Sequence, residues 1–151
     1  MERKKKKIGE ILVEKGMLKP EQLNLALKEQ KISDQFLGEI LLKKRWIKES
    51  ELLAVLSEQF TIPIVELKYK YVDWKLLGKY SPSLVMDFHC VPVSEDDVSV
   101  TMALTNPLDL DVLQKAEAEA RGLKVKLVLT TKSDIDYVIE RYRDHVKSKY
   151  K

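Results

Sequence analysis

The sequence predicts an α+β fold in two parts, an N-terminal small helical bundle of two repeated helix pairs packed on a C-terminal compact α/β subdomain. Residues 7–30 recur at 36–59 with an offset of 29 positions, and ten of the 24 aligned pairs are identical. After residue 60 the helical periodicity gives way to short runs of alternating apolar and polar residues, which are typical of strands. We therefore expect a helical tandem-repeat subdomain at 1–60 and an α/β subdomain at 61–151.

Each copy of the repeat predicts a helix, a short turn and a second helix. In the first copy, Ile8 and Leu12 fall on one helical face, and Gly16 is a suitable helix terminator. Pro20 then stands near the first turn of a helix that carries Leu23. The second copy has the same plan, so four short helices with one apolar stripe each predict a bundle.

The second half begins with a segment at 62–67 that predicts a short strand, with its proline at the start or on an edge. Asp73 is expected to cap a helix that runs to Leu77, and Ser81 another that runs to Phe88. These helices lead into the strands of the α/β subdomain.

Apolar residues then alternate on either side of the polar segment 94–97, which predicts a β-hairpin. Residues 106–109 begin a helix that runs to about Arg121. A further strand is expected at 125–129, followed by a final helix that Ser133 and Asp134 cap. Helices that alternate with short strands in this way indicate a compact α/β arrangement.

Composition and charge exclude several classes of protein. Hydrophobic content of 44% and charged content of 34% indicate a soluble globular protein, and no apolar run reaches the roughly 18 residues of a membrane span, so no membrane insertion is expected. The net charge of +3 comes from residues 1–60, which hold 13 basic and 10 acidic residues and include the cluster Arg3–Lys7. Cys90 is the single cysteine, cannot form an internal disulfide and favours a cytoplasmic location.

The sequence carries no catalytic motif. No GxxxxGK[ST] segment is present, and the five glycines are too dispersed for a phosphate-binding loop. Two histidines and one cysteine lack the spacing of metal ligands. His89 and Cys90 are adjacent, but in an extended chain their side chains point to opposite faces. We therefore expect no catalytic residues, no metal and no enzymatic activity.

Two glycines inside the helical pattern need an explanation, because glycine costs a helix interior about 1 kcal/mol. Gly9 and Gly38 occupy equivalent positions of the two copies. Either a ligand approaches the backbone there, or two helices contact each other closely. Leu12 and Leu41 belong to the core or form the floor of a groove under a flat ring. A repeated site of this kind suits a ligand made of two equivalent halves.

The repeated pattern resembles the MshEN domain, the N-terminal domain of type II secretion and type IV pilus assembly ATPases. The pattern is a basic residue, LG, two residues, L, a later G and LxxxLxxQ, and the two copies are separated by the five residues 31–35. The segments IPIVEL, VPVSEDDVSVTMALTNPLD and SDIDYVIERY of the second half also match that family in kind and order. The resemblance covers nearly the whole chain and implies its fold.

The resemblance also implies a ligand, because many members bind cyclic di-GMP through the tandem motif, one guanine half in each repeat. The early basic residue and the LG backbone would contact base and phosphate, the leucines would lie beneath the base, and the terminal glutamine at a polar edge. The implied ligand-binding residues are Lys7, Ile8, Gly9, Leu12 and Gln30 in the first copy, and Leu37, Gly38, Leu41 and Gln59 in the second.

Three residues depart from the family pattern. Lys7 stands where the family usually has arginine, and an ammonium does not reproduce the planar, bidentate guanidinium. Phe36 occupies the equivalent position of the second copy, so it supplies an aromatic face in place of a charge. Arg45 replaces the glycine matched by Gly16 and is expected to alter the turn. Asp109 either caps a helix or contacts a ligand across the subdomain interface.

The resemblance implies a non-enzymatic, cytoplasmic module that senses cyclic di-GMP and acts on a protein component of a bacterial secretion, type IV pilus or motility system. The alternative is a protein-interaction module of the same apparatus that has lost nucleotide binding. Nucleic acid is not an expected partner, because the basic residues do not cluster on the second helix of either repeat. With no Walker motif, the chain is either free-standing or a piece of an ATPase, and Lys147–Lys151 would begin a linker or end the chain.

Overall fold

The computed structural model describes residues 7–149 of the 151-residue chain. The chain divides into two compact units, Met1–Gln59 and Phe60–Lys151. Helices and a three-stranded sheet are both present, which confirms the α+β class. The basic residues at 3–6 and the chain end at 150–151, both singled out in the sequence, lie outside the described residues.

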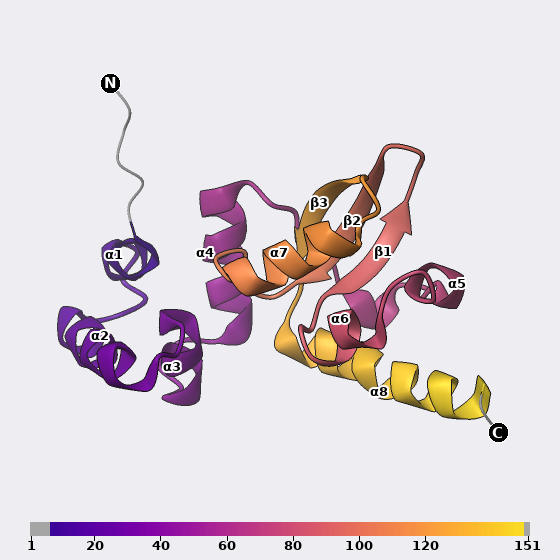
Figure 1. The fold of residues 1–151 in the computed structure, drawn as a ribbon. Coiled ribbons are helices and arrows are strands. Elements are labelled where there is room, and N and C mark those ends of the chain that lie inside the picture. The colour runs from indigo at the N-terminus through magenta and orange to yellow at the C-terminus, as the bar shows by residue number, and fades with distance from the viewer. Residues whose placement is uncertain (1–6, 150–151) are drawn as a thin grey trace. The chain divides into compact units, whose positions relative to one another are not determined.

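The first unit is helical throughout its described part, and Figure 1 shows its helices in indigo and magenta. Its helices are α1 (Ile8–Glu14), α2 (Pro20–Ser33), α3 (Leu37–Lys43) and α4 (Glu49–Phe60). The second helix of each pair begins in the same way. The Lys19 amide donates to Gln22 Oε1 at 2.9 Å, and at the equivalent position the Lys48 amide donates to Glu51 Oε1 at 3.0 Å. The helix–turn–helix pattern predicted for each copy is therefore present.

The turn that ends the first helix is also the same in both copies. Gly16 and Arg45 both adopt the left-handed conformation, with φ of 72° and 58°. In each copy this residue and its successor donate their amides to carbonyls three and five residues back, at 2.9–3.1 Å. The expectation that Arg45 alters the turn is wrong, because the hydrogen bonds of the helix end hold the backbone in place and Arg45 takes the strained conformation instead.

The second unit contains a sheet of order β1-β2-β3. β1 (Val91–Glu95) and β2 (Ser99–Leu104) form the predicted antiparallel hairpin, with an irregularity in register between Pro92 and Ser94. β3 (Lys124–Leu129) pairs with β2 in parallel, from Ser99 opposite Lys124 to Leu104 opposite Leu129. Because parallel neighbours need a long crossover, α7 (Leu110–Glu119) connects the two strands.

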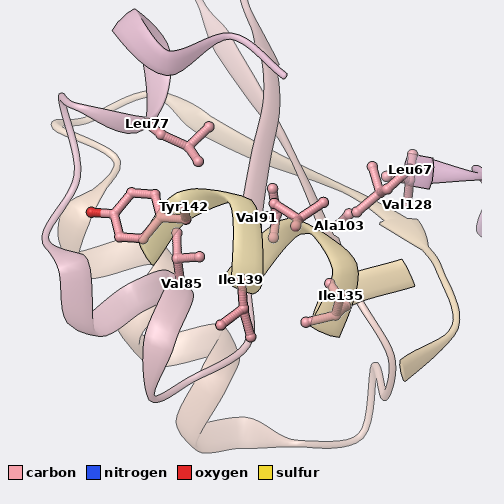
Figure 2. Packing of buried hydrophobic residues seen from close by; sticks show 10 residues of the cluster. Leu67, Leu77, Val85, Val91, Ala103, Val128, Ile135, Ile139 and Tyr142 are labelled. Atoms are coloured by element: carbon pink, nitrogen blue, oxygen red, sulfur yellow. The ribbon is translucent and has the colours of Figure 1, made fainter. Parts of the chain in front are cut away.

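Helices cover both faces of this sheet. On one face, Val91, Ala103 and Val128 pack against the side chains of α8 (Lys132–Lys149), as Figure 2 shows for Ile135, Ile139 and Tyr142. α5 (Trp74–Leu77) and α6 (Pro82–Met86) extend this cluster through Leu77 and Val85. On the other face, Val100 and Met102 pack against Ala116 and Ala120 at α7. Each buried aliphatic side chain contributes about 1.5–3 kcal/mol, so the two clusters hold the unit together.

The strand expected at 62–67 does not form. A single parallel bridge joins Ile64 to Leu129, in which the Val65 amide donates to the Leu129 carbonyl and the Leu129 amide donates to Pro63, both at 2.8 Å. Pro63 has no N–H with which to continue the ladder. The chain then turns into a short 3₁₀ helix, Leu67–Tyr69, so the strand prediction is wrong.

The predicted helix starts are correct in three cases. The carboxylate of Asp73 accepts hydrogen bonds from the amides of Lys75 and Leu76. Ser81 Oγ accepts a hydrogen bond from the amide of Leu84. Asp109 Oδ1 accepts one from the amide of Val112. Asp109 therefore has the cap role that was one of its two alternatives.

Three helix boundaries differ from the sequence prediction. α8 begins at Lys132 with Thr131 as its cap, because Thr131 Oγ1 accepts the amide of Asp134 at 3.1 Å. α6 ends at Met86, before Phe88, and α7 ends at Glu119, before Arg121. The left-handed residue that follows the end of the helix is Arg121, with φ of 57°, which directly precedes the expected terminator Gly122.

Glu119 joins the start of α6 to the end of α7. Its carboxylate accepts the Ser81 amide and the Ser81 hydroxyl, both at 2.6 Å, and pairs with Lys115 at 3.1 Å. Burial by itself raises the pKa of Glu119, but the hydrogen bonds from Ser81 and the contact with Lys115 outweigh it and hold the pKa below its usual value. The ionised carboxylate therefore stabilises the folded state.

We predict that Arg45→Gly raises the free energy of unfolding by about 0.5–1 kcal/mol, because it removes a side chain from a left-handed residue while glycine adds entropy to the unfolded chain. Gly16→Arg, the matched reverse change, lowers it by a similar amount. Urea unfolding of both variants measures this. Equal stability of all three proteins would show that the turn carries no strain at Arg45.

We predict that Glu119→Gln destabilises the protein by about 1–3 kcal/mol at pH 7, because hydrogen bonds to a charged group are lost. Since the folded-state pKa of Glu119 is lowered, its contribution is present above the unfolded pKa of about 4.3 and is lost as pH falls through the folded pKa. Thermal melts of variant and native protein should therefore converge as the pH falls below the unfolded pKa and through the lowered folded pKa. Glu117→Gln, an exposed change on the same helix, is the control. A difference independent of pH would contradict the prediction.

Candidate functional site

The two positions that the sequence marks for the early ligand contact have the same backbone. Lys7 precedes α1 with φ −69° and ψ 149°, and Phe36 precedes α3 with φ −68° and ψ 145°. The Lys7 carbonyl accepts the amide of Ile11, and the Phe36 carbonyl that of Ile40, both at 3.2 Å. An ammonium and an aromatic ring therefore leave the chain from equivalent points.

The repeated glycines lie at contacts between helices. A Cβ atom at Gly9 would lie 2.5 Å from Leu23 Cδ1, and one at Gly38 would lie 2.9 Å from Leu52 Cδ2. Leu23 and Leu52 are equivalent residues of α2 and α4. Close helix–helix contact, one of the two explanations offered by the sequence, is therefore present in both copies.

The same glycine brings the two copies together. A Cβ atom at Gly9 would also lie 3.2 Å from Leu37 Cδ2, and Leu37 in α3 is the counterpart of Ile8 in α1. Gly9, the second residue of α1, therefore lies close to the side chain of Leu37, the first residue of α3.

Two ion pairs, which the sequence reasoning missed, join the copies reciprocally. Lys15 pairs with Glu58, and the equivalent Lys44 pairs with Glu29, in both cases with 3.2 Å between Nζ and Oε2. Each lysine thus contacts the glutamate of the other copy, which is the pattern that a twofold axis generates. With Lys15 and Glu58 42% and 73% exposed, that pair adds at most about 1 kcal/mol. The sequence did contain a signal for these pairs, because both copies have lysine at the first position, 15 and 44, and glutamate at the second, 29 and 58.

The leucines of the motif are enclosed, and its glutamines are half-buried. Leu12 and Leu41 are fully enclosed, with 0% exposure, and belong to the core of the helical unit. Gln30 and Gln59 are half-buried near the ends of α2 and α4. Ile8 is half-buried and Leu37 is buried at the first position of its helix. A role of these residues toward a ligand stays a prediction.

Neither a reactive cysteine nor a metal-binding cluster is found among residues 7–149. Cys90 is buried with Sγ 3.7 Å from Met102 Sδ, and burial raises the pKa of its thiol to about 12, so it stays protonated. Within the described residues, no group of three histidine, cysteine, aspartate or glutamate residues is placed to hold a metal ion. No described helix combines the length and the apolar character that crossing a membrane requires.

Comparison with known proteins places this geometry in a family. The model of the MshEN domain matches residues 60–149, which lie in the second unit. The chain belongs to the MshEN domain family. The resemblance noted in the sequence is confirmed, although the family model matches the α/β unit and the sequence pattern that suggested it lies in the helical one.

Two kinds of relatives resemble this MshEN chain. The type IV pilus assembly ATPase PilB of Thermus thermophilus is 27% identical over 139 residues, which are 91% of this chain and 16% of PilB. The chain therefore spans about a sixth of the length of that relative. The structure of MshE with cdg superimposes with a TM-score of 0.80 at 23% identity, over 91% of this chain and 99% of MshE as solved.

The N-terminal domain of XpsE, solved in two crystal forms, has the same fold. The TM-scores are 0.71 and 0.58 at 23% and 24% identity, over 93% of this chain and 98% and 99% of the XpsE chains. At such identities the likeness shows the fold of this MshEN chain, including its helical unit.

We predict that Gly9→Ala destabilises the MshEN chain by about 1 kcal/mol, because the new methyl group displaces Leu23 by more than helix propensity regains. Leu23→Ala vacates that space, so the double variant should lose at least about 0.5 kcal/mol less than the sum of the single losses. Urea unfolding of the four proteins measures this coupling. Gly9→Ala combined with Leu52→Ala is the crossed control and should be additive; equal coupling in both cycles would mean that the contact is not specific.

Proposed function

We propose that this MshEN chain is a non-enzymatic regulatory module that binds cyclic di-GMP through the repeated motif of its helical unit. In this proposal the subdomain of residues 1–60 holds the ligand, and the subdomain of 61–151 transmits the signal to a protein of a bacterial secretion, type IV pilus or motility system in the cytoplasm. The observation that carries the proposal is the close approach of Gly9, near the start of α1, to Leu37, at the start of α3.

The chemistry of these positions supports a ligand with two similar halves and negative charge. The reciprocal pairs of Lys15 and Lys44 relate the two copies as a twofold axis would, and cyclic di-GMP has the same symmetry. Lys7 is exposed and supplies a cation, while the basic excess of residues 1–60 favours a dianion. That a structure of MshE with cdg has the same fold supports the choice of ligand.

In this proposal the remaining motif residues support the bound bases. The Gly9 and Gly38 backbones would contact the ligand, together with Ile8 and Leu37. Leu12 and Leu41 would lie beneath the bases, and the amides of Gln30 and Gln59 would meet their polar edges. Because Leu12 and Leu41 are enclosed, a base could contact them only if the starts of α1 and α3 moved. Ligand binding would then change the packing of the helical unit.

A second candidate function, a protein-interaction module without nucleotide, is favoured by exposed apolar side chains. Tyr69 and Tyr71 are 80% and 88% exposed, and Leu25 and Ile32 of α2 are 55% and 88% exposed. Tyrosine and large aliphatic residues are common at the centres of protein interfaces. Such surfaces are compatible with the sensor function, because a regulatory module also needs a partner.

We predict that cyclic di-GMP binds with one molecule per chain and that Lys7→Ala and Gln30→Ala each weaken binding about tenfold, since a good polar contact to a base is worth about 1–3 kcal/mol. Titration calorimetry and thermal shift measure this. Lys28→Ala, which removes an exposed charge from α2, is the control and should bind normally. No heat and no thermal shift at high micromolar ligand would exclude the sensor function and favour the interaction module.

We also predict that Lys7→Arg strengthens binding of cyclic di-GMP several-fold, because a guanidinium holds its two donors in a rigid plane and stacks on a base, whereas an ammonium is a flexible point charge that does not stack. The same titration measures this change. Equal or weaker binding by the variant would show that the cation at this position acts as a simple point charge.

A further inference from the structure

The two half-sites of the proposed nucleotide site differ in chemistry although their backbones agree. The dihedral angles at Lys7 and Phe36 match within 4°, and each residue is followed by a helix of the same length. The difference between the halves therefore lies in the side chains. Given the proposed function, on which this inference rests, that difference decides which bases the site accepts.

Both side chains are available to a ligand. Lys7 is exposed, and within residues 7–149 its ammonium forms no ion pair. Phe36 is half-buried, and within the same residues its ring stacks on no other ring and lies under no cation. Gly9, two residues after Lys7, lies close to the side chain of Leu37, which directly follows Phe36. A single ligand would therefore meet a cation at one end and a ring at the other.

These two side chains read bases differently. The N7 and O6 atoms of guanine both accept hydrogen bonds, so the ammonium of Lys7 can donate to them, whereas adenine presents an amino donor beside its N7. A phenyl ring has no donor or acceptor and interacts with the face of any base by stacking. The side chain at position 7 therefore favours guanine over adenine, whereas the side chain at position 36 gives no such preference.

Most of the other motif residues are identical in the two half-sites. Leu12 and Leu41 are identical and equally enclosed, and Gln30 and Gln59 are identical at equivalent positions. Gly9 and Gly38 are also the same. The difference in base selectivity thus reduces to one pair of positions, 7 and 36.

We propose that the site takes a cyclic dinucleotide in which only one base must be guanine. The half-site at Lys7 holds that guanine, and the half-site at Phe36 accepts guanine or adenine. A mixed ligand with one base of each kind binds as well as cyclic di-GMP, with its guanine at Lys7.

Titration calorimetry on the full chain with three ligands tests this inference. The cyclic dinucleotides with two guanines and with one guanine and one adenine should bind within about threefold of each other. The one with two adenines should bind at least about tenfold more weakly, because at Lys7 an amino donor then replaces the O6 acceptor of guanine. If cyclic di-GMP binds tenfold or more tightly than the mixed ligand, the inference is wrong while the proposed function stands. If none of the three binds, the proposed function fails as well.

Two variants separate base selectivity from a general loss of binding. Phe36→Arg gives the second half-site its own donor and should lower the affinity for the mixed ligand about tenfold relative to cyclic di-GMP. The exchange Lys7→Phe with Phe36→Lys should leave the order of the three ligands unchanged, because the ligand binds in the reversed orientation. Equal binding of the ligand with two adenines to the native chain would also overturn the inference, since Lys7 would then not read guanine. Circular dichroism of each variant checks that the helices are retained.

Discussion

The helical unit depends on the absence of a side chain at one position in each repeat. At Gly9 and Gly38 the first helix of a pair lies so near the second that a methyl group would fall within 2.5–2.9 Å of a leucine. This distance sets how closely the helices of a pair pack. At Gly9 it also allows Leu37 of the other copy to approach, so the starts of α1 and α3 meet. Any site built from both copies would depend on this contact.

Duplication explains why the unit has a twofold character and why that character is incomplete. Residues that hold the copies in place are the same in both: the glycines, the enclosed leucines and the reciprocal lysine–glutamate pairs. Residues at the helix starts are free to differ, because an N-cap without a side-chain hydrogen bond places no demand on the fold. Lys7 and Phe36 differ at such a position. The two copies thus have the same residues where helices pack against each other, and different residues at the helix starts, where the proposed ligand would bind.

The α/β unit uses its polar groups for structure. Parallel pairing of β2 with β3 requires α7 between them, and Glu119 near the end of that helix receives the hydroxyl and amide of Ser81. Cys90 is enclosed beside Met102 with its thiol protonated. Tyr69 and Tyr71 are exposed on the surface of this unit.

The sequence by itself determined the repeat, the α+β class and most elements, because hydrophobic periodicity and cap residues act locally. Asp73, Ser81 and Asp109 cap as their sequence context predicts. Tertiary structure decided the rest. No strand forms at 62–67, because Pro63 has no N–H to donate to β3. Arg45 adopts the same left-handed turn as Gly16, because the hydrogen bonds at the end of the helix require it. The partner of Lys15 lies 43 residues away and the contact of Gly9 with Leu37 joins two copies, so neither was visible in local pattern; only folding brings such positions together.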